Sequence, residues 1–126
     1  ETGGMKGKRE ELPKDEFHTI LCGAFGVTEV HSEYGMAELS SQAYSSGAGV
    51  FRTPPWMRVS IRDVNDPLAY LPEGRTGGVN ITDLANIYSC AFIQTQDLGV
   101  AGPDGSFSIL GRIDNSQLRG CNLMVG

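Results

Sequence analysis

Three short segments of the chain carry residue types that could do chemistry. In the first, Tyr34-Gly35-Met36-Ala37-Glu38, the aromatic ring could stack on a nucleotide base, the glycine would let the backbone approach it, and the glutamate could bind a hard cation such as Mg²⁺. A buried tyrosine, a turn glycine and a solvated glutamate would give the same pattern. The segment therefore leaves both interpretations open.

The other two segments lie nearer the end of the chain. Asp97 follows Thr95-Gln96, and its two carboxylate oxygens could accept both hydroxyls of a ribose diol, although an aspartate at such a place is also typical of a turn. Arg112 could bind ribose or phosphate oxygens, because its guanidinium stays charged. Asp114 could cap a helix or form a turn, and residues 114–118 have the composition of a connector to a second domain.

The cysteines and histidines are a separate set of candidates. The 3 cysteines are unevenly spaced, which fits neither a disulfide framework nor a zinc site. Cys121 follows an arginine-glycine pair, and nearby positive charge favours the nucleophilic thiolate, so this thiol is either reactive or structural. Cys22 and Cys90 are predicted to be inert core thiols. Neither His18 nor His31 has a second ligand at metal-binding spacing.

Length and charge limit the classes of protein to consider. The 126 residues are enough for one domain, and the apolar share of 40% can form a core without a disulfide or a structural metal. Ten basic and 15 acidic residues give a net charge of -5, and the lack of a basic run argues against nucleic-acid and anionic-lipid partners. No apolar stretch is long enough for membrane insertion. We therefore expect a cytoplasmic protein and, since the chain does not begin with Met, a fragment of a longer one.

One helix is predicted ahead of these segments. Apolar residues recur at helical spacing after Pro13, acidic residues occupy the first turn, and Gly26 is a stop signal. The apolar piece 27–30 then leads to the Tyr34 segment, and residues 40–49 are predicted to be a loop.

Strands are predicted in the rest of the chain. Residues 57–62 alternate apolar and polar side chains, which predicts a strand with Arg58, Ser60 and Arg62 facing water. Further strands are predicted over 79–82, 88–95 and 107–110, with a half-turn over 84–87. The turn at 102–105 predicts that the last two strands form a hairpin. The fold class is therefore α+β: one amphipathic helix followed by a small mixed or antiparallel β-sheet or distorted barrel.

The order of the candidate segments is more specific than any one of them. A Tyr-Gly-Met-x-Glu loop, a Thr-x-Asp-x-Gly strand end and a Gly-Arg-x-Asp hinge resemble the succession found in the adenylate-forming, AMP-forming ligases. Within that superfamily the chain is most similar to the acyl-protein synthetases, the fatty-acid-activating component of bacterial bioluminescence. The segments that carry this similarity are EYGMAELSSQAYS, PPWMRVSIRD, TDLANIYSCAFIQTQDLG and LGRIDNSQLRGCNLM. Together they resemble only the last third or so of a family member.

The resemblance implies a role for each residue of the first segment. Tyr34 would stack on the adenine of ATP or AMP, and Gly35, Met36 and Ala37 would belong to the same nucleotide site. Glu38 would hold Mg²⁺ across the phosphates. Ala37 departs from the superfamily, whose members usually have a threonine that contacts the α-phosphate, and the lost hydrogen bond would cost about 1 kcal/mol.

The resemblance also implies roles for the later residues. Asp97 would bind the ribose diol and Arg112 the ribose or phosphate edge, while Asp114 would be the hinge about which a small lobe turns. Cys121 would accept the acyl group. Residues 1–111 would then be the C-terminal part of the large domain, and residues 112–126 the hinge and the start of the small lobe.

The function that the resemblance implies is that of an ATP-dependent acyl-protein synthetase, of which this chain is the C-terminal part. The complete enzyme would activate a fatty acid or other carboxylic acid as acyl-AMP, transfer the acyl group to a thiol, and work with an acyl-reductase protein. The fragment alone would be inactive. Two alternatives stay open: a CoA ligase of the phenylacetate-CoA-ligase type, and a non-catalytic docking or scaffold module.

Overall fold

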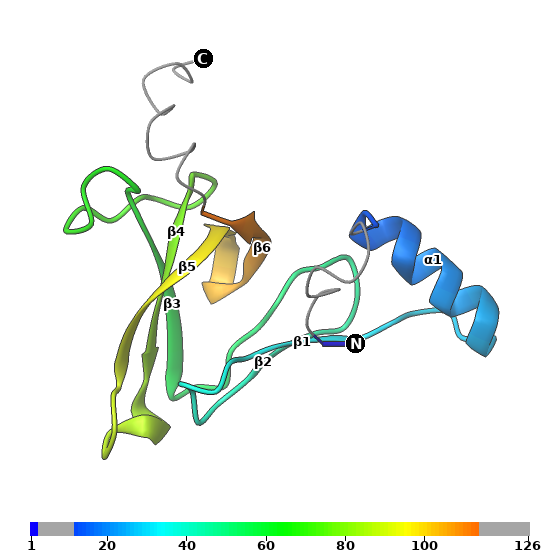
Figure 1. Cartoon of the computed structure of the whole chain (residues 1–126), viewed down its shortest axis with the longest axis horizontal. Helices are drawn as coiled ribbons and strands as arrows, with labels where there is room; N and C mark the ends of the chain where they lie inside the picture. The colour runs from blue at the N-terminus through cyan, green and yellow to red at the C-terminus, as the bar shows by residue number, and fades with distance from the viewer. Residues whose placement is uncertain (3–11, 114–126) are drawn as a thin grey trace.

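A computed structural model of the protein describes residues 1–2 and 12–113. In chain order the elements are α1 (Lys14–Phe25), β1 (Ser32–Tyr34), β2 (Ala43–Ser45), β3 (Met57–Arg62), β4 (Thr76–Asp83), the 3-10 turn η1 (Leu84–Asn86), β5 (Phe92–Ala101), the 3-10 turn η2 (Pro103–Gly105) and β6 (Phe107–Arg112). β1 pairs with β2, and the other strands form an antiparallel sheet in the order β3-β4-β5-β6 (Figure 1). This architecture confirms the predicted α+β class.

The helix α1 begins and ends where its signals predict. Pro13 precedes it, and Gly26 ends it in the left-handed region at φ 65°, where a residue without a Cβ is favoured. The helix lies away from the large sheet, beyond the ribbon formed by β1 and β2 (Figure 1). Each of its described residues keeps part of its surface exposed. It is not long and apolar enough to cross a membrane, and neither is any other helix in the part of the chain that the structure describes.

The small ribbon differs from its prediction. Its first strand, Ser32–Tyr34, follows the apolar piece 27–30, and its second, Ala43–Ser45, lies inside the predicted loop. Tyr34 pairs with Ala43, and the covered face of β2 consists of Ala43 and Ser45, exposed by 0% and 1%. Small side chains bury without forming an apolar pattern, so the sequence around β2 looked like a loop.

The hairpin of β5 and β6 is confirmed, but β5 occupies a later stretch of chain than predicted. It begins at Phe92 and continues to Ala101, because residues 84–91 form η1 and the turn that follows it. The Asp83 carboxylate starts that turn by accepting a hydrogen bond from the Ala85 N–H. Cys90 therefore precedes the strand and is exposed, so its prediction as a core thiol was wrong.

The core has two clusters that share their outer residues. Met57, Ile61, Val79 and Ile81 form one between β3 and β4, and Ala43, Phe51 and Phe107 form the other. The backbones of Phe51 and Phe107 exchange hydrogen bonds of 2.8 and 3.1 Å, and their rings stack with centroids 5.5 Å apart. This bridge joins the small ribbon to the large sheet.

Phe107→Ala tests the importance of that bridge. Phe107 is 1% exposed, so its removal leaves a cavity between the two sheets and is expected to lower the free energy of unfolding by about 3–5 kcal/mol. Denaturant unfolding followed by circular dichroism measures this change. The matched control is Phe92→Ala: that ring is 73% exposed, and a loss of equal size there would contradict the assignment of the core.

Candidate functional site

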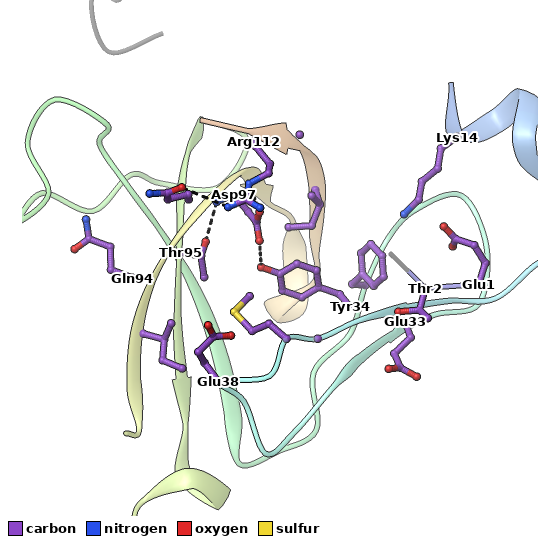
Figure 2. A pocket seen from close by; sticks show the side chains of 17 residues that line it. Glu1, Thr2, Lys14, Glu33, Tyr34, Glu38, Gln94, Thr95, Asp97 and Arg112 are labelled. Atoms are coloured by element: carbon purple, nitrogen blue, oxygen red, sulfur yellow. Dashed lines mark hydrogen bonds and ion pairs between the residues drawn. The ribbon is translucent and has the colours of Figure 1, made fainter. Parts of the chain in front are cut away.

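A cavity of about 840 Å³ opens between the Tyr34 segment, β5 and the end of β6. Figure 2 shows side chains from these three regions pointing into it. Six of the residues singled out from the sequence line the cavity: Tyr34, Gly35, Met36, Glu38, Asp97 and Arg112. Ala37 is not among the lining residues. Asp114 and Cys121 lie outside the described residues.

The Tyr34 side chain connects the aromatic core to the cavity. Its ring packs edge-on against Phe107 at 5.6 Å and lies 6.0 Å from Phe51, between centroids. Its hydroxyl donates a 2.6 Å hydrogen bond to Asp97 Oδ2 (Figure 2). Burial, and next the hydrogen bond to Asp97, raise the pKa of Tyr34 far above its ordinary value. The tyrosine therefore stays a neutral hydrogen-bond donor to the carboxylate.

Asp97 and Arg112 face each other across the β5–β6 hairpin. They are register partners, and Arg112 Nε lies 3.9 Å from Asp97 Oδ1. The Arg112 side chain is 73% exposed and also donates a long hydrogen bond, 3.4 Å, to Gln96 Oε1. An exposed ion pair of this length contributes little to stability. The guanidinium is thus free to exchange its partner for an anionic ligand in the cavity.

Glu38 is an exposed carboxylate at the cavity wall. The structure brings no three His, Cys, Asp or Glu side chains together as a metal site within residues 1–2 and 12–113. Mg²⁺ commonly binds to one or two carboxylates plus the phosphates of a substrate, so a single glutamate in this position fits that mode.

A buried aspartate that the sequence analysis missed holds the Tyr34 segment in place. Asp83, at the end of β4, is 0% exposed. Its Oδ2 accepts from the N–H groups of Ser40 and Ser41, both at 2.9 Å, and its Oδ1 accepts from Ser41 Oγ at 2.8 Å. Asn86, in η1, donates to the Glu38 carbonyl at 2.7 Å. The chain around Glu38 is therefore fastened to the large sheet.

The environment of Asp83 favours its charged form. Burial by itself raises the pKa of a carboxyl group, but the hydrogen bonds from Ser41, Ser40 and Ala85 outweigh that effect and lower the pKa of Asp83 below its ordinary value. The sequence does contain a signal for this residue, since an aspartate directly before a short helical turn is a common N-cap.

Asp83→Asn tests this anchor. An amide Nδ2 cannot accept from the serine N–H groups, so the substitution is expected to reduce the free energy of unfolding at pH 7 by about 2 kcal/mol. Because the pKa of Asp83 is lowered in the folded state, its contribution is complete above the ordinary aspartate pKa of about 3.9 and is lost as the pH falls through the folded-state value.

Denaturant unfolding of both proteins as a function of pH measures this effect, and the difference between them should shrink below about pH 4. Asp104→Asn is the control, because Asp104 is an exposed residue in a left-handed turn that asparagine also tolerates. A difference between wild type and Asp83→Asn that does not depend on pH would contradict a charged anchor.

Comparison with known proteins shows similarity to one curated enzyme. The chain is 25% identical over 135 aligned residues to the long-chain-fatty-acid–luciferin-component ligase of Vibrio harveyi. The alignment covers 98% of this chain but only 35% of that enzyme, so the chain spans about a third of the length of its relative. No protein-family profile matches the chain.

Solved structures share the fold. ATP-bound MatB from Rhodopseudomonas palustris superposes with a TM-score of 0.59 at 20% identity, over 77% of this chain and 23% of MatB. The luciferase-like enzyme of the mealworm Zophobas morio superposes with a TM-score of 0.60 at 17% identity, over 81% of this chain and 30% of that enzyme. The AMP complex of the O-succinylbenzoate coenzyme A synthetase MenE from Bacillus subtilis superposes with a TM-score of 0.54 at 21% identity, over 74% of this chain and 23% of MenE. The chain thus has the fold of a segment of the adenylate-forming ligases and, along nearly all its length, is similar in sequence to a curated fatty-acid ligase.

Proposed function

We propose that this chain is a segment of an ATP-dependent acyl-protein synthetase and that its cavity is part of the nucleotide site. The observation that carries the proposal is the convergence of Tyr34, Asp97 and Arg112, which are distant in sequence, on one cavity. The similarity to a fatty-acid ligase over 98% of the chain supports the same activity.

The cavity suits a nucleotide in size and in chemistry. Small-molecule and cofactor sites commonly have volumes of about 300–1,000 Å³, and this cavity has about 840 Å³. Among the described residues, one Asp97 oxygen bonds to Tyr34 and the other has only a long contact with Arg112, so the second oxygen can accept from a ribose hydroxyl. Arg112 supplies a charged donor for ribose or phosphate oxygens.

The phosphate side of the site would depend on Glu38. In this proposal its carboxylate would hold Mg²⁺, and the cation would supply positive charge to offset the charge of the phosphates. Ala37 has no hydroxyl to donate to the α-phosphate and does not line the cavity. The stabilisation of the transferring phosphate therefore has to come from Arg112, from the cation and from residues outside this chain.

The proposed reaction has two steps. A carboxylate oxygen of the fatty acid attacks the α-phosphorus of ATP; the new C–O–P linkage forms as the bond to the β-phosphate breaks, and pyrophosphate leaves. A thiol then gives its proton to solvent and attacks the acyl carbonyl, which forms a thioester and releases AMP. Activation is needed because a carboxylate is a poor electrophile, whereas AMP is a good leaving group.

The acceptor thiol in this proposal is Cys121, and an acyl-reductase protein would take the acyl group from it. Residues 1–111 would belong to the large domain and residues 112–126 to the hinge and the small lobe, with Asp114 as the pivot. These assignments rest on sequence resemblance to the acyl-protein synthetases.

Asp97→Ala tests adenylation in the complete protein that carries this chain. With fatty acid, ATP and Mg²⁺, the wild type is expected to catalyse acid-dependent exchange of pyrophosphate into ATP. Loss of hydrogen bonds to a charged group should reduce the affinity for ATP about tenfold or more. Asp104→Asn, at an exposed position whose left-handed backbone asparagine tolerates, is the control. If the wild type shows no exchange and AMP gives no thermal stabilisation, the chain is a docking or scaffold module and the proposal is wrong.

Cys121→Ser tests the acceptor. Radiolabelled fatty acid with ATP and Mg²⁺ should label the complete protein as a hydroxylamine-sensitive thioester, and Cys121→Ser should abolish the label while pyrophosphate exchange continues. Cys90→Ser, at an exposed thiol, is the matched control and should keep full label. Full label on Cys121→Ser would refute the cysteine role, and label that appears only in added CoA would identify a CoA ligase.

A further inference from the structure

Arg62, the last residue of β3, has an environment opposite to its prediction. The alternating pattern of residues 57–62 predicted that Arg62 faces water, but the residue is only 5% exposed. Its neighbour Ile61, on the opposite face, is also buried, so this end of β3 is covered on both sides. Among the described residues, no carboxylate lies within ion-pair distance of the guanidinium. Burial lowers the pKa of Arg62, but an arginine side chain keeps its charge.

The guanidinium lies at an irregularity of the β4–β5 pairing. Gly78 pairs with Leu98, and Asn80 pairs with Gln94. Between these pairs β4 supplies only Val79, whereas β5 supplies residues 95–97, and Asp97 is the last of them. Such a bulge disrupts the regular ladder and leaves backbone groups that need other partners.

Arg62 provides these partners. Its Nη1 donates to the Val79 carbonyl at 3.0 Å and to Asn80 Oδ1 at 2.7 Å. Its Nη2 donates to the Thr95 carbonyl at 2.7 Å. Gly78 makes the space, since a Cβ at that position would collide with Arg62 Cζ. One planar cation thus ties together both strands that form the bulge.

The ties continue to the cavity through Thr95. The Thr95 hydroxyl donates to the Val79 carbonyl at 2.8 Å and accepts from the Asp97 N–H at 3.0 Å. Thr95 therefore links Arg62 to Asp97: its carbonyl accepts from the Arg62 guanidinium, and its hydroxyl accepts from the Asp97 N–H. The Asp97 carboxylate, which points towards Tyr34 and Arg112, lies at the end of this series of hydrogen bonds.

We propose that Arg62 is a positioning residue for the ribose site: by holding the β5 bulge, it presents the Asp97 carboxylate to the ribose diol. The inference goes beyond the proposed function by adding a buried residue that does not line the cavity, and its ribose part rests on that function. Its effect should be largest on the two ribose hydroxyls, because in the proposed site these are the ligand groups that contact Asp97 itself.

The experiment compares AMP with 2′,3′-dideoxy-AMP, which lacks both hydroxyls, in calorimetric titrations of the complete protein. The wild type should prefer AMP. Arg62→Met keeps an apolar stem but has no donor, so it should weaken AMP binding about tenfold and weaken dideoxy-AMP binding much less. The AMP affinity of Arg62→Lys should lie between those of the wild type and Arg62→Met, because lysine retains the charge without the planar fork of donors.

The matched control is Arg58→Met. Arg58 lies on the same strand and the same face, four positions earlier, but it is exposed. Its substitution should change neither affinity. Hydrogen exchange without nucleotide gives a second measurement: Arg62→Met should speed exchange of peptides that cover residues 94–98 about tenfold, and Arg58→Met should not.

The outcomes separate the two proposals. If Arg62→Met weakens the binding of both ligands equally, or changes neither hydrogen exchange nor the preference for AMP, the positioning role is overturned. If the wild type binds both ligands equally, the proposed nucleotide site fails together with the ribose role, and exchange still decides whether Arg62 holds the bulge. Should Arg62→Met not fold, Thr95→Val removes the hydroxyl link from the same network and should abolish the AMP preference.

Discussion

The β5 bulge is the constraint on which the rest of the site depends. Three residues of β5 face one residue of β4, so Asp97 has no partner on β4, although it stays paired with Arg112 on β6. A bulge of this size costs backbone hydrogen bonds unless other donors replace them. Here the replacements are the Arg62 guanidinium and the Thr95 hydroxyl. The irregularity is therefore well supported, and it turns a sheet edge into the wall of a cavity.

The second wall of that cavity is held by a different set of interactions. The aromatic cluster of Tyr34, Phe51 and Phe107 attaches the small ribbon to the large sheet, and the buried Asp83 carboxylate fastens the chain that follows Glu38. Apolar packing sets the distance between the two parts, while the directional hydrogen bonds of Asp83 set the path of the loop. The Tyr34–Asp97 hydrogen bond then joins the two walls directly.

Charge is used differently inside and outside this site. Arg62 and Asp83 are covered, and each is surrounded by hydrogen-bonding partners that suit its charged form. Arg112 and Glu38 are exposed at the cavity, and the ion pair of Arg112 with Asp97 is long. The buried Arg62 and Asp83 shape the site, whereas the exposed Arg112 and Glu38 are available to a ligand.

The sequence by itself determined the elements whose signals are local. Pro13 and Gly26 bound the helix, alternation in residues 57–62 predicted β3, and the turn at 102–105 predicted the hairpin. The order of the Tyr34, Asp97 and Arg112 segments was also enough to single them out, because chemistry restricts residue types within short motifs. Only the tertiary structure decided what depends on pairing between distant strands. It placed Arg62 inside, because the bulge needs donors there, and made Asp83 an anchor, because serines far along the chain reach it. It also brought the three segments to one cavity, since strand register is set by contacts that no local pattern contains.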